Sequence, residues 1–232
     1  MNNLAEKLME ELECRTAFTN PIFGGIPVPE SAVISWVIIA VLVLLSIFFT
    51  RRLKKVPVGK QCLIEIGINW LNNFFLETIG PKGKKYLPIL ETLIIYIGFS
   101  NIIGIFGLRP PTKDLGVTMT LAIIAIILIQ YASIREKGTR GWLRSFKKPM
   151  AIMLPINVLE LVIKPLSLCM RLFGNVLGAF VVMELIKLCI PVGVPLVFGL
   201  YFDLFDGIIQ AYVFVFLTSM YLSEVLEDEE EA

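Results

Sequence analysis

The sequence predicts an all-α polytopic membrane protein with five membrane-crossing helices and one amphipathic helix at the membrane interface. Hydrophobic residues make up 56% of the 232 positions, which is more than a soluble domain of this length carries. Five apolar runs are long enough to cross the roughly 30 Å hydrocarbon core of a bilayer. Charged residues gather mainly in the short segments between these runs. We therefore expect one integral membrane domain over residues 1–232.

Composition also argues against several kinds of partner and cofactor. The net charge is +1 and the basic residues are spread over separate clusters, so no nucleic-acid partner is indicated. The chain has no histidine, and its four cysteines form no C-x-x-C pair. Zinc and haem sites depend on these residues and motifs. We therefore expect no metal site and no cofactor.

The first part of the chain predicts one membrane span and one interfacial helix. Residues 1–30 are polar and end in a proline-containing loop over residues 20–29. Residues 31–50 form a clean apolar span, which a basic cluster follows. Residues 58–80 mix Lys60, Glu65 and several asparagines with large apolar side chains. Such a mixture is typical of a helix that lies in the membrane interface.

The rest of the chain predicts four further spans, separated by a proline turn, a basic loop and a short uncharged turn. The spans cover residues 87–108, 115–134, 151–189 and 196–222, with the basic loop at residues 135–148 and an acidic tail at residues 224–232.

The fourth span is too long for a helix perpendicular to the membrane. One continuous helix over residues 155–188 would reach about 51 Å at about 1.5 Å per residue, against about 30 Å of hydrocarbon. One alternative is a long tilted helix pair, formed with residues 196–226. The other is a kink at Pro165. The sequence leaves both open.

The positive-inside rule orients the chain in the membrane. The basic clusters after the first span, before the second span and over residues 135–148 should be cytoplasmic. The turns at residues 109–114 and 191–195 carry little positive charge and should lie outside. This assignment puts residues 1–30 outside the cytoplasm and the acidic tail, residues 224–232, in the cytoplasm.

Arg171 lies deep within the fourth apolar run. An arginine does not give up its proton in a protein, and a cation at mid-bilayer costs at least about 2.5 kcal/mol. A charged residue at such a position indicates a functional site with a negatively charged partner.

Other polar or small residues share the helical face of Arg171. They are Glu160, Lys164, Ser167, Asn175 and Gly178. A polar stripe on a membrane helix must face protein or water. Alternatively, Glu160 and Lys164 form an i,i+4 pair near the interface, and only Arg171 is deep. Gly174 and Gly178 also fit the small-xxx-small pattern that lets another helix approach closely.

The last span carries a matching set, Asp203, Asp206 and Gln210, at i, i+3 and i+7. A turn near residue 193 would make an antiparallel hairpin, with Gln210 and Arg171 at comparable depths. Both aspartates would then lie nearer the outside, level with Glu184. Acids near the outer end and a fixed cation deeper in suggest a water-filled path that ends at a charge barrier. The alternative is that an aspartate simply neutralises Arg171.

Three motifs resemble those of one family. They are Pro165-Leu166-Ser167-x-x-Met170-Arg171-Leu172-Phe173-Gly174-Asn175, Ile209-Gln210-Ala211-Tyr212-Val213-Phe214, and Asn101-Ile102-Ile103-Gly104 followed by Pro111-Thr112-Lys113-Asp114-Leu115. Together they resemble subunit a of the membrane sector of rotary F-type ATP synthases of the bacterial type. The resemblance covers nearly the whole chain.

The resemblance implies a stator ion-channel subunit in a bacterial plasma membrane, with two half-channels that couple H⁺ or Na⁺ flow to rotation of a c-subunit ring. Its implied partners are that ring, the b subunits of the peripheral stalk and the rest of the ATP synthase. Arg171 would be the essential stator arginine facing the ring, with Gln210 as its polar neighbour. Ser167 and Asn175 would border the ion path, and Asn101 of the third motif is assigned to it as well.

The resemblance departs from the family pattern at one position. Many bacterial members carry an acid nine residues after the arginine, and here that residue is Phe180. The family often pairs that position with an acid or histidine seven residues before the glutamine, and here that residue is Asp203. We therefore assign the half-channel carboxylate to Asp203, with Glu184 or Asp206 as helpers.

Two other functions compete with this interpretation. A self-contained ion channel or secondary transporter would use Arg171 with Asp203 and Asp206 as its own relay. A purely structural scaffold would leave the polar stripe without a purpose. No phosphate-binding loop or hydrolase motif is present in the sequence, so we expect a non-catalytic subunit.

Overall fold

The computed structural model describes residues 16–20, 26–51, 59–106, 108–145, 154–189, 193 and 198–227. Its helices include five that are long and apolar enough to cross a membrane. They are Glu30–Thr50, Pro81–Ile105, Leu115–Trp142, Leu154–Met183 and Phe198–Leu226. The predicted class, an all-α polytopic membrane protein with five spans, is confirmed.

A short β-hairpin precedes the first membrane helix. Strand β1, Thr16–Asn20, pairs antiparallel with β2, Ile26–Pro29. The predicted loop over residues 20–29 is therefore wrong for its strand residues. Phe18, Ile26 and Val28 suit an extended backbone, although the flanking prolines favour a loop. The rest of the segment, residues 1–15 and 21–25, lies outside the described residues.

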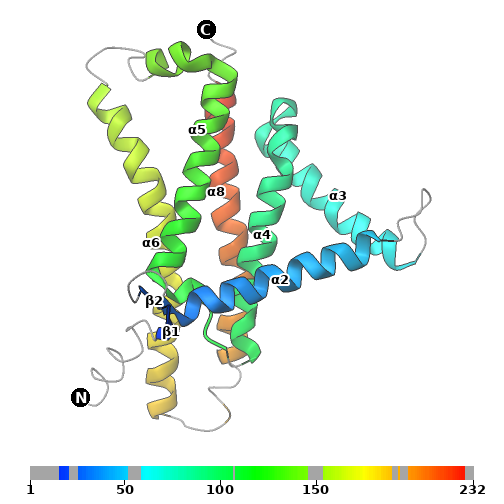
Figure 1. Ribbon diagram of the computed structural model, residues 1–232, viewed down its shortest axis with the longest axis vertical. Coiled ribbons are helices and arrows are strands. Elements are labelled where there is room, and N and C mark those ends of the chain that lie inside the picture. The colour runs from blue at the N-terminus through cyan, green and yellow to red at the C-terminus, as the bar shows by residue number, and fades with distance from the viewer. Residues whose placement is uncertain are drawn as a thin grey trace.

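Helix α2, Glu30–Thr50, begins directly after β2 and is apolar on all sides. Only Ile34, Ser35 and Ile38 are buried. Ser31 Oγ donates a 2.5 Å hydrogen bond to Asp114 Oδ2, which fastens the beginning of α2 to the start of α5. Figure 1 shows α2 running crosswise to α4, α5, α6 and α8. Most of its side chains therefore remain uncovered by the rest of the chain.

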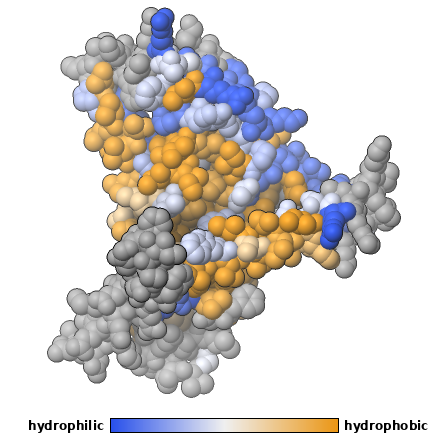
Figure 2. Space-filling model, in the orientation of Figure 1, coloured by the Kyte–Doolittle hydropathy of each residue, from blue (hydrophilic) through white to orange (hydrophobic). Residues whose placement is uncertain are grey.

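Helix α3, Lys60–Ile79, is followed by the 3₁₀ turn η2, Pro81–Tyr86, and by helix α4, Leu87–Ile102. Gly80 has a φ of 78° and makes the turn between α3 and η2. A second 3₁₀ turn, η3, covers Ile103–Phe106. Figure 2 shows hydrophilic side chains along the upper and right-hand margin, over the start of α4 and over α3, and hydrophobic side chains over the flanks below.

Helix α5 follows the 3₁₀ turn η4, Pro111–Lys113, and covers Leu115–Ser145. It is interrupted at Gly138, whose φ of 67° only glycine adopts without strain. The predicted loop over residues 135–148 is therefore wrong up to residue 145, because helix resumes after this glycine. Figure 1 shows the last part of α5 lying across the top of the bundle. Residues 146–153 lie outside the described residues.

Helix α6, Leu154–Cys189, is a single helix of 36 residues with Pro165 in its interior. At about 1.5 Å per residue it is about 54 Å long, well beyond the hydrocarbon thickness. The helix continues through Pro165, so its length exceeds the hydrocarbon thickness whether it tilts or bends there.

The last membrane helix contains a change of helix type. Residues 198–200 are α-helical, η6, Tyr201–Asp206, is π-helical, and α8 covers Gly207–Glu227. The helix thus extends into the predicted acidic tail, of which residues 228–232 lie outside the described residues.

The core lies where α4, α5 and α6 surround α8, with the end of α3 packed against it. Its fully buried members include Phe75, Leu90, Ile97, Ala122, Ala125, Leu172, Phe214, Val215 and Leu222. Helices α4 and α8 run antiparallel, because Gly83 approaches Leu226, Gly98 approaches Ala211 and Asn101 approaches Gly207. This packing fixes α8, and α8 in turn positions the face described next.

Candidate functional site

The structure leaves Arg171 exposed on the surface of α6. Leu168, Cys169 and Leu172 of the same helix turn are buried in the core. No described residue forms an ion pair or a hydrogen bond with the guanidinium of Arg171. The alternative that Asp206 neutralises Arg171 is therefore not what the structure contains. An uncompensated arginine in an apolar helix requires a partner or water.

Two contacts fix where Arg171 lies along α6. Towards the N-terminus, Lys164 Nζ lies 2.8 Å from Glu224 Oε2 of α8 and 3.5 Å from Glu160 Oε2. Towards the C-terminus, Lys113 Nζ lies 4.3 Å from the ring centroid of Phe180. Arg171 is roughly 10 Å from Lys164 and roughly 13 Å from Phe180 along the helix at about 1.5 Å per residue. Arg171 therefore lies near the middle of α6, between two basic groups. The Glu160–Lys164 pair, one of the alternatives in the sequence analysis, is present.

Helices α6 and α8 meet through a pair of amides. Asn175 Nδ2 donates a hydrogen bond to Gln210 Oε1. Gln210 is 2% exposed, and its Nε2 is buried without a hydrogen-bond partner among the described residues. The structure thus brings two predicted site residues together, one helix turn from Arg171. Ser167, one turn on the other side of Arg171, is half-buried.

The two glycines near Arg171 do not pack against the chain's own helices. A Cβ atom added to Gly174 or Gly178 would meet nothing within 4 Å, and both residues are exposed. The expectation that they let another helix approach closely is therefore not met by any described helix of this chain. The face that carries Arg171, Gly174, Asn175 and Gly178, here called the open face, is smooth and uncovered.

Asp203 and Asp206 lie in a π-helical turn, and not in the unbroken α-helix expected from the sequence. The expectation that Asp203, Asp206 and Gln210 share one face supposed an unbroken α-helix. In η6 the hydrogen bonds run from i to i+5, so the position of Asp203 within this turn is rotated relative to Gln210. Asp206 is half-buried. The side chains of Asp203 and Glu184 lie outside the described residues.

Asn101 is buried, with 4% of its surface exposed, and it connects three segments. Its Nδ2 donates to the carbonyl oxygen of Gly207 at 2.9 Å. Its Oδ1 accepts from Thr112 Oγ1 at 2.7 Å. Both ends of the amide therefore have partners inside the protein.

Sequence reasoning missed three polar residues that the structure makes prominent. Thr112 is fully buried and bonded to Asn101. Lys113 lies over Phe180, the position where an acid was expected by family resemblance. Glu91 of α4 has a buried Oε1 with no hydrogen-bond partner among the described residues. Glu91 had a signal in the sequence as a single acid within an apolar span, and Thr112 and Lys113 belong to the third motif.

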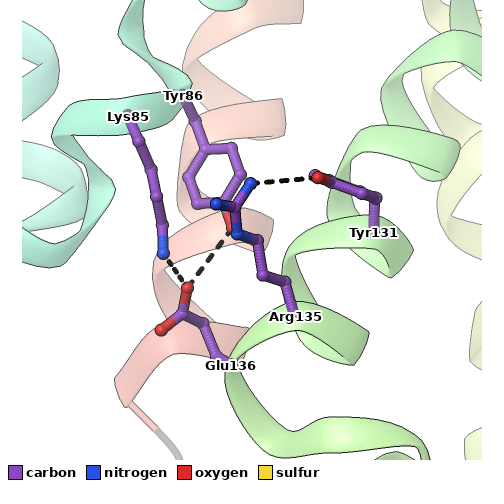
Figure 3. A network of polar contacts seen from close by, with 5 residues as sticks. All are labelled: Lys85, Tyr86, Tyr131, Arg135 and Glu136. Carbon is purple, nitrogen blue, oxygen red and sulfur yellow. Dashed lines mark hydrogen bonds and ion pairs between the residues drawn. The ribbon is translucent and has the colours of Figure 1, made fainter.

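A second polar cluster joins α5 to the segment before α4. Lys85 Nζ forms an ion pair with Glu136 Oε1, and the Tyr86 hydroxyl donates to the same oxygen at 3.5 Å. Arg135 Nη1 donates to the Tyr131 hydroxyl at 3.0 Å. Figure 3 shows these five side chains converging between the two segments. The cluster holds the helix ends together at the side of the bundle where the basic residues gather.

The fold and the open face define a class: a multi-pass membrane protein whose last two helices present an arginine without a described partner beside two amides. Residues 32–223 match the family model described as ATP synthase A chain. The chain therefore belongs to that family, whose members are membrane subunits of ATP synthase.

Individual relatives agree with the family match. The chain is 39% identical over 202 residues to ATP synthase subunit a of Moorella thermoacetica, a match that covers 86% of this chain and 92% of that protein. It is 34% identical over 202 residues to ATP synthase subunit a 2 of a Bradyrhizobium species, covering 86% and 89%. It is 31% identical over 222 residues to the sodium-ion-specific ATP synthase subunit a of Propionigenium modestum, covering 89% and 77%.

Proposed function

We propose that this chain is the stator ion-channel subunit of an F-type ATP synthase and that Arg171 is its essential residue. The observation that carries the proposal is an exposed arginine near the middle of α6, with no ionic partner among the described residues. A ring of small c subunits, each with a carboxylate at mid-membrane, would supply the missing negative charge as it turns past the open face.

The chemistry of coupling follows from the cost of charge in lipid. A rotor carboxylate crosses the hydrocarbon only when an ion neutralises it, because the bare charge is too costly there. At about 4 Å and an effective dielectric constant near 20, Arg171 attracts the carboxylate by about 4 kcal/mol, or roughly three pKa units. The carboxylate therefore releases its ion on reaching Arg171 and binds another after passing it.

Two half-channels bring ions to and from this point. On the outer side we assign Asp203 as the principal carboxylate, with Asp206 and Glu184 as helpers. The hydrogen-bonded pair Asn175–Gln210 borders the path beside Arg171. Arg171 prevents a direct leak between the half-channels, because its permanent charge repels cations.

Two further residues border or support the ion path, and the membrane potential drives the ion along it. Ser167 borders the path on the other side of Arg171, and Asn101 supports its outer end. The coupling ion is H⁺ or Na⁺. The membrane potential biases the direction of movement by about 2.3 kcal/mol per charge per 100 mV.

The orientation and partners belong to the same proposal. The amino-terminal segment lies outside the cytoplasm, and the acidic end of the chain lies in the cytoplasm, because the basic clusters mark the cytoplasmic side. The protein is a single membrane domain of a bacterial plasma membrane. It contacts the c-ring on one side and the b subunits of the peripheral stalk elsewhere, and it is non-catalytic by itself.

Replacement of Arg171 tests the proposal. In membrane vesicles that contain the whole complex, Arg171→Ala should abolish ATP synthesis driven by an imposed ion gradient. The matched control is Arg140→Ala, because Arg140 is exposed after the break in α5 and should tolerate the loss. If Arg171→Ala made ATP at the rate of the unchanged complex, the proposal would be wrong. Ion flux through liposomes that contain this chain alone would instead favour a self-contained channel or transporter.

A further inference from the structure

The π-helical turn η6, Tyr201–Asp206, stands directly before the buried face of α8. A π-helical turn is rare and costs hydrogen-bond geometry, so it persists where surrounding contacts hold it. No proline lies within Tyr201–Asp206, although Gly199 and Gly207 flank the turn. The turn also has stabilising contacts with other elements.

One such contact joins the end of η6 to α4. Gly207 is the first residue after the π-helical turn, and its carbonyl oxygen accepts a 2.9 Å hydrogen bond from Asn101 Nδ2. The approach is close enough that a Cβ on Gly207 would lie 2.8 Å from the Cβ of Asn101. Since both groups are buried, neither can exchange this bond for one with water.

The amide of Asn101 is itself oriented by a third element. Thr112 Oγ1, in η4, donates to Asn101 Oδ1 at 2.7 Å. That bond makes the Nδ2 group the end that faces Gly207. The next residue, Lys113, lies over the Phe180 ring of α6. The chain of contacts therefore links η4, α4 and the end of η6, with α6 adjoining through Lys113.

We infer that Asn101 and Thr112 are positioning residues, which hold η6 in its π-helical form and so set the direction in which the outer acids of the ion path lie. This inference rests on the proposed function, because that function assigns Asp203 and Asp206 to the path. It gives Asn101 a different role from that of an ion ligand. The amide acts through the backbone of Gly207.

The physical consequence is a rotation of the outer helix segment. One π-helical turn accommodates one more residue than an α-helical turn, so the segment before it is rotated by about 100° relative to α8. If η6 relaxed to α-helix, Asp203 would rotate by a large part of that angle and Asp206, next to Gly207, by much less, while Gln210 stayed in the core. Ion delivery would suffer, but the core of α8 would remain packed.

The test replaces Thr112 in the whole complex with a residue of nearly equal shape. Thr112→Val removes the hydroxyl that orients Asn101, and Thr112→Ser retains it as the conservative control. Asn101→Asp is a second variant, which keeps the size of the side chain and removes the N–H group that faces Gly207. Asn101→Asp can be measured in place of Thr112→Val if the Thr112→Val complex assembles poorly.

Two measurements separate positioning from simple support of the fold. The first is the electron paramagnetic resonance spectrum of a nitroxide at Phe205→Cys, a position in η6 that is 54% exposed. Ile209→Cys, which is 42% exposed in α8, is the matched control site. The second is the ion concentration that gives half-maximal ATP synthesis in vesicles, compared with the maximal rate.

We expect Thr112→Val and Asn101→Asp to change the nitroxide spectrum at position 205 but not at position 209. Both should raise the half-saturating ion concentration about fivefold, the factor that one lost buried hydrogen bond produces. Thr112→Ser should leave both the nitroxide spectrum at position 205 and the half-saturating ion concentration unchanged. Unchanged spectra, or changed spectra with an unchanged ion requirement, would overturn the inference. The proposed function fails separately, if Arg171→Ala still supports coupled synthesis.

Discussion

At the scale of single residues, the candidate site combines a charge that has no described partner with an amide whose N–H group has none. Arg171 has no ionic partner among the described residues, and Gln210 has a buried Nε2 without an acceptor among them. A buried N–H group without an acceptor costs about 1–3 kcal/mol. A carboxylate, or water that accompanies it, on the open face would satisfy Arg171, whereas the Nε2 of Gln210 lies inside the protein.

Replacement of Gln210 tests the amide's contribution. Gln210→Leu keeps the approximate size and removes the acceptor of the Asn175 hydrogen bond, so ion-driven ATP synthesis should fall about fivefold, as expected when a hydrogen bond of about 1 kcal/mol is lost. Thr218→Val is the control, because Thr218 is also buried on α8 but donates to the Phe214 carbonyl of its own helix. Synthesis by Gln210→Leu at the same rate as by Thr218→Val would exclude a direct role for the amide.

At the scale of elements, the α4–α8 contact depends on small residues at two levels. At Gly207 an added Cβ would approach the Cβ of Asn101 to 2.8 Å, which neither backbone can accommodate without shifting. At Gly98 an added Cβ would lie 4.0 Å from that of Ala211, an ordinary contact distance. The two glycines on one interface therefore differ in how much space is available.

This difference predicts the effect of two alanine substitutions. Gly207→Ala should destabilise the subunit by about 1–3 kcal/mol through overpacking and reduce the amount of assembled complex. Gly98→Ala should assemble normally, since the added methyl group fits. The measurement is the amount of intact complex after mild heating of solubilised membranes. Equal losses for both variants would contradict the packing described here.

The helices that the bilayer requires could be predicted from the sequence. The features that depend on contacts between distant residues could not. Apolar runs must become helices in lipid, because their backbone groups find no water there. The π-helical turn at Tyr201–Asp206 depends instead on Asn101, which is about a hundred positions earlier in the chain. The extension of α5 to Ser145 depends on Gly138 turning the helix where basic residues suggested a loop.

The candidate site was predictable in part for the same reason. Arg171 and Gln210 are conspicuous because lipid excludes unpaired polar groups. Thr112 and Lys113 lie in a turn where polar residues are ordinary, so nothing in the sequence marks one as buried and the other as stacked on Phe180.

At the scale of the whole molecule, the helices are arranged asymmetrically. Helices α4, α5 and α8 bury the core, whereas α2 crosses them and exposes most of its surface (Figure 1). Helix α6 covers the core with the side that carries Leu168 and Leu172 and leaves the open face uncovered. We propose that a turning ring of acidic subunits occupies that face.

A photoactivatable cross-linker attached at Gly174→Cys or Gly178→Cys tests this claim most directly. Both positions have free space around them, and the control site is Ile123→Cys, which is 46% exposed on α5. In native membranes the probes at positions 174 and 178 should form adducts with the small ring subunit, identified by mass spectrometry, and the probe at position 123 should not. Ring adducts from position 123 alone would contradict the account.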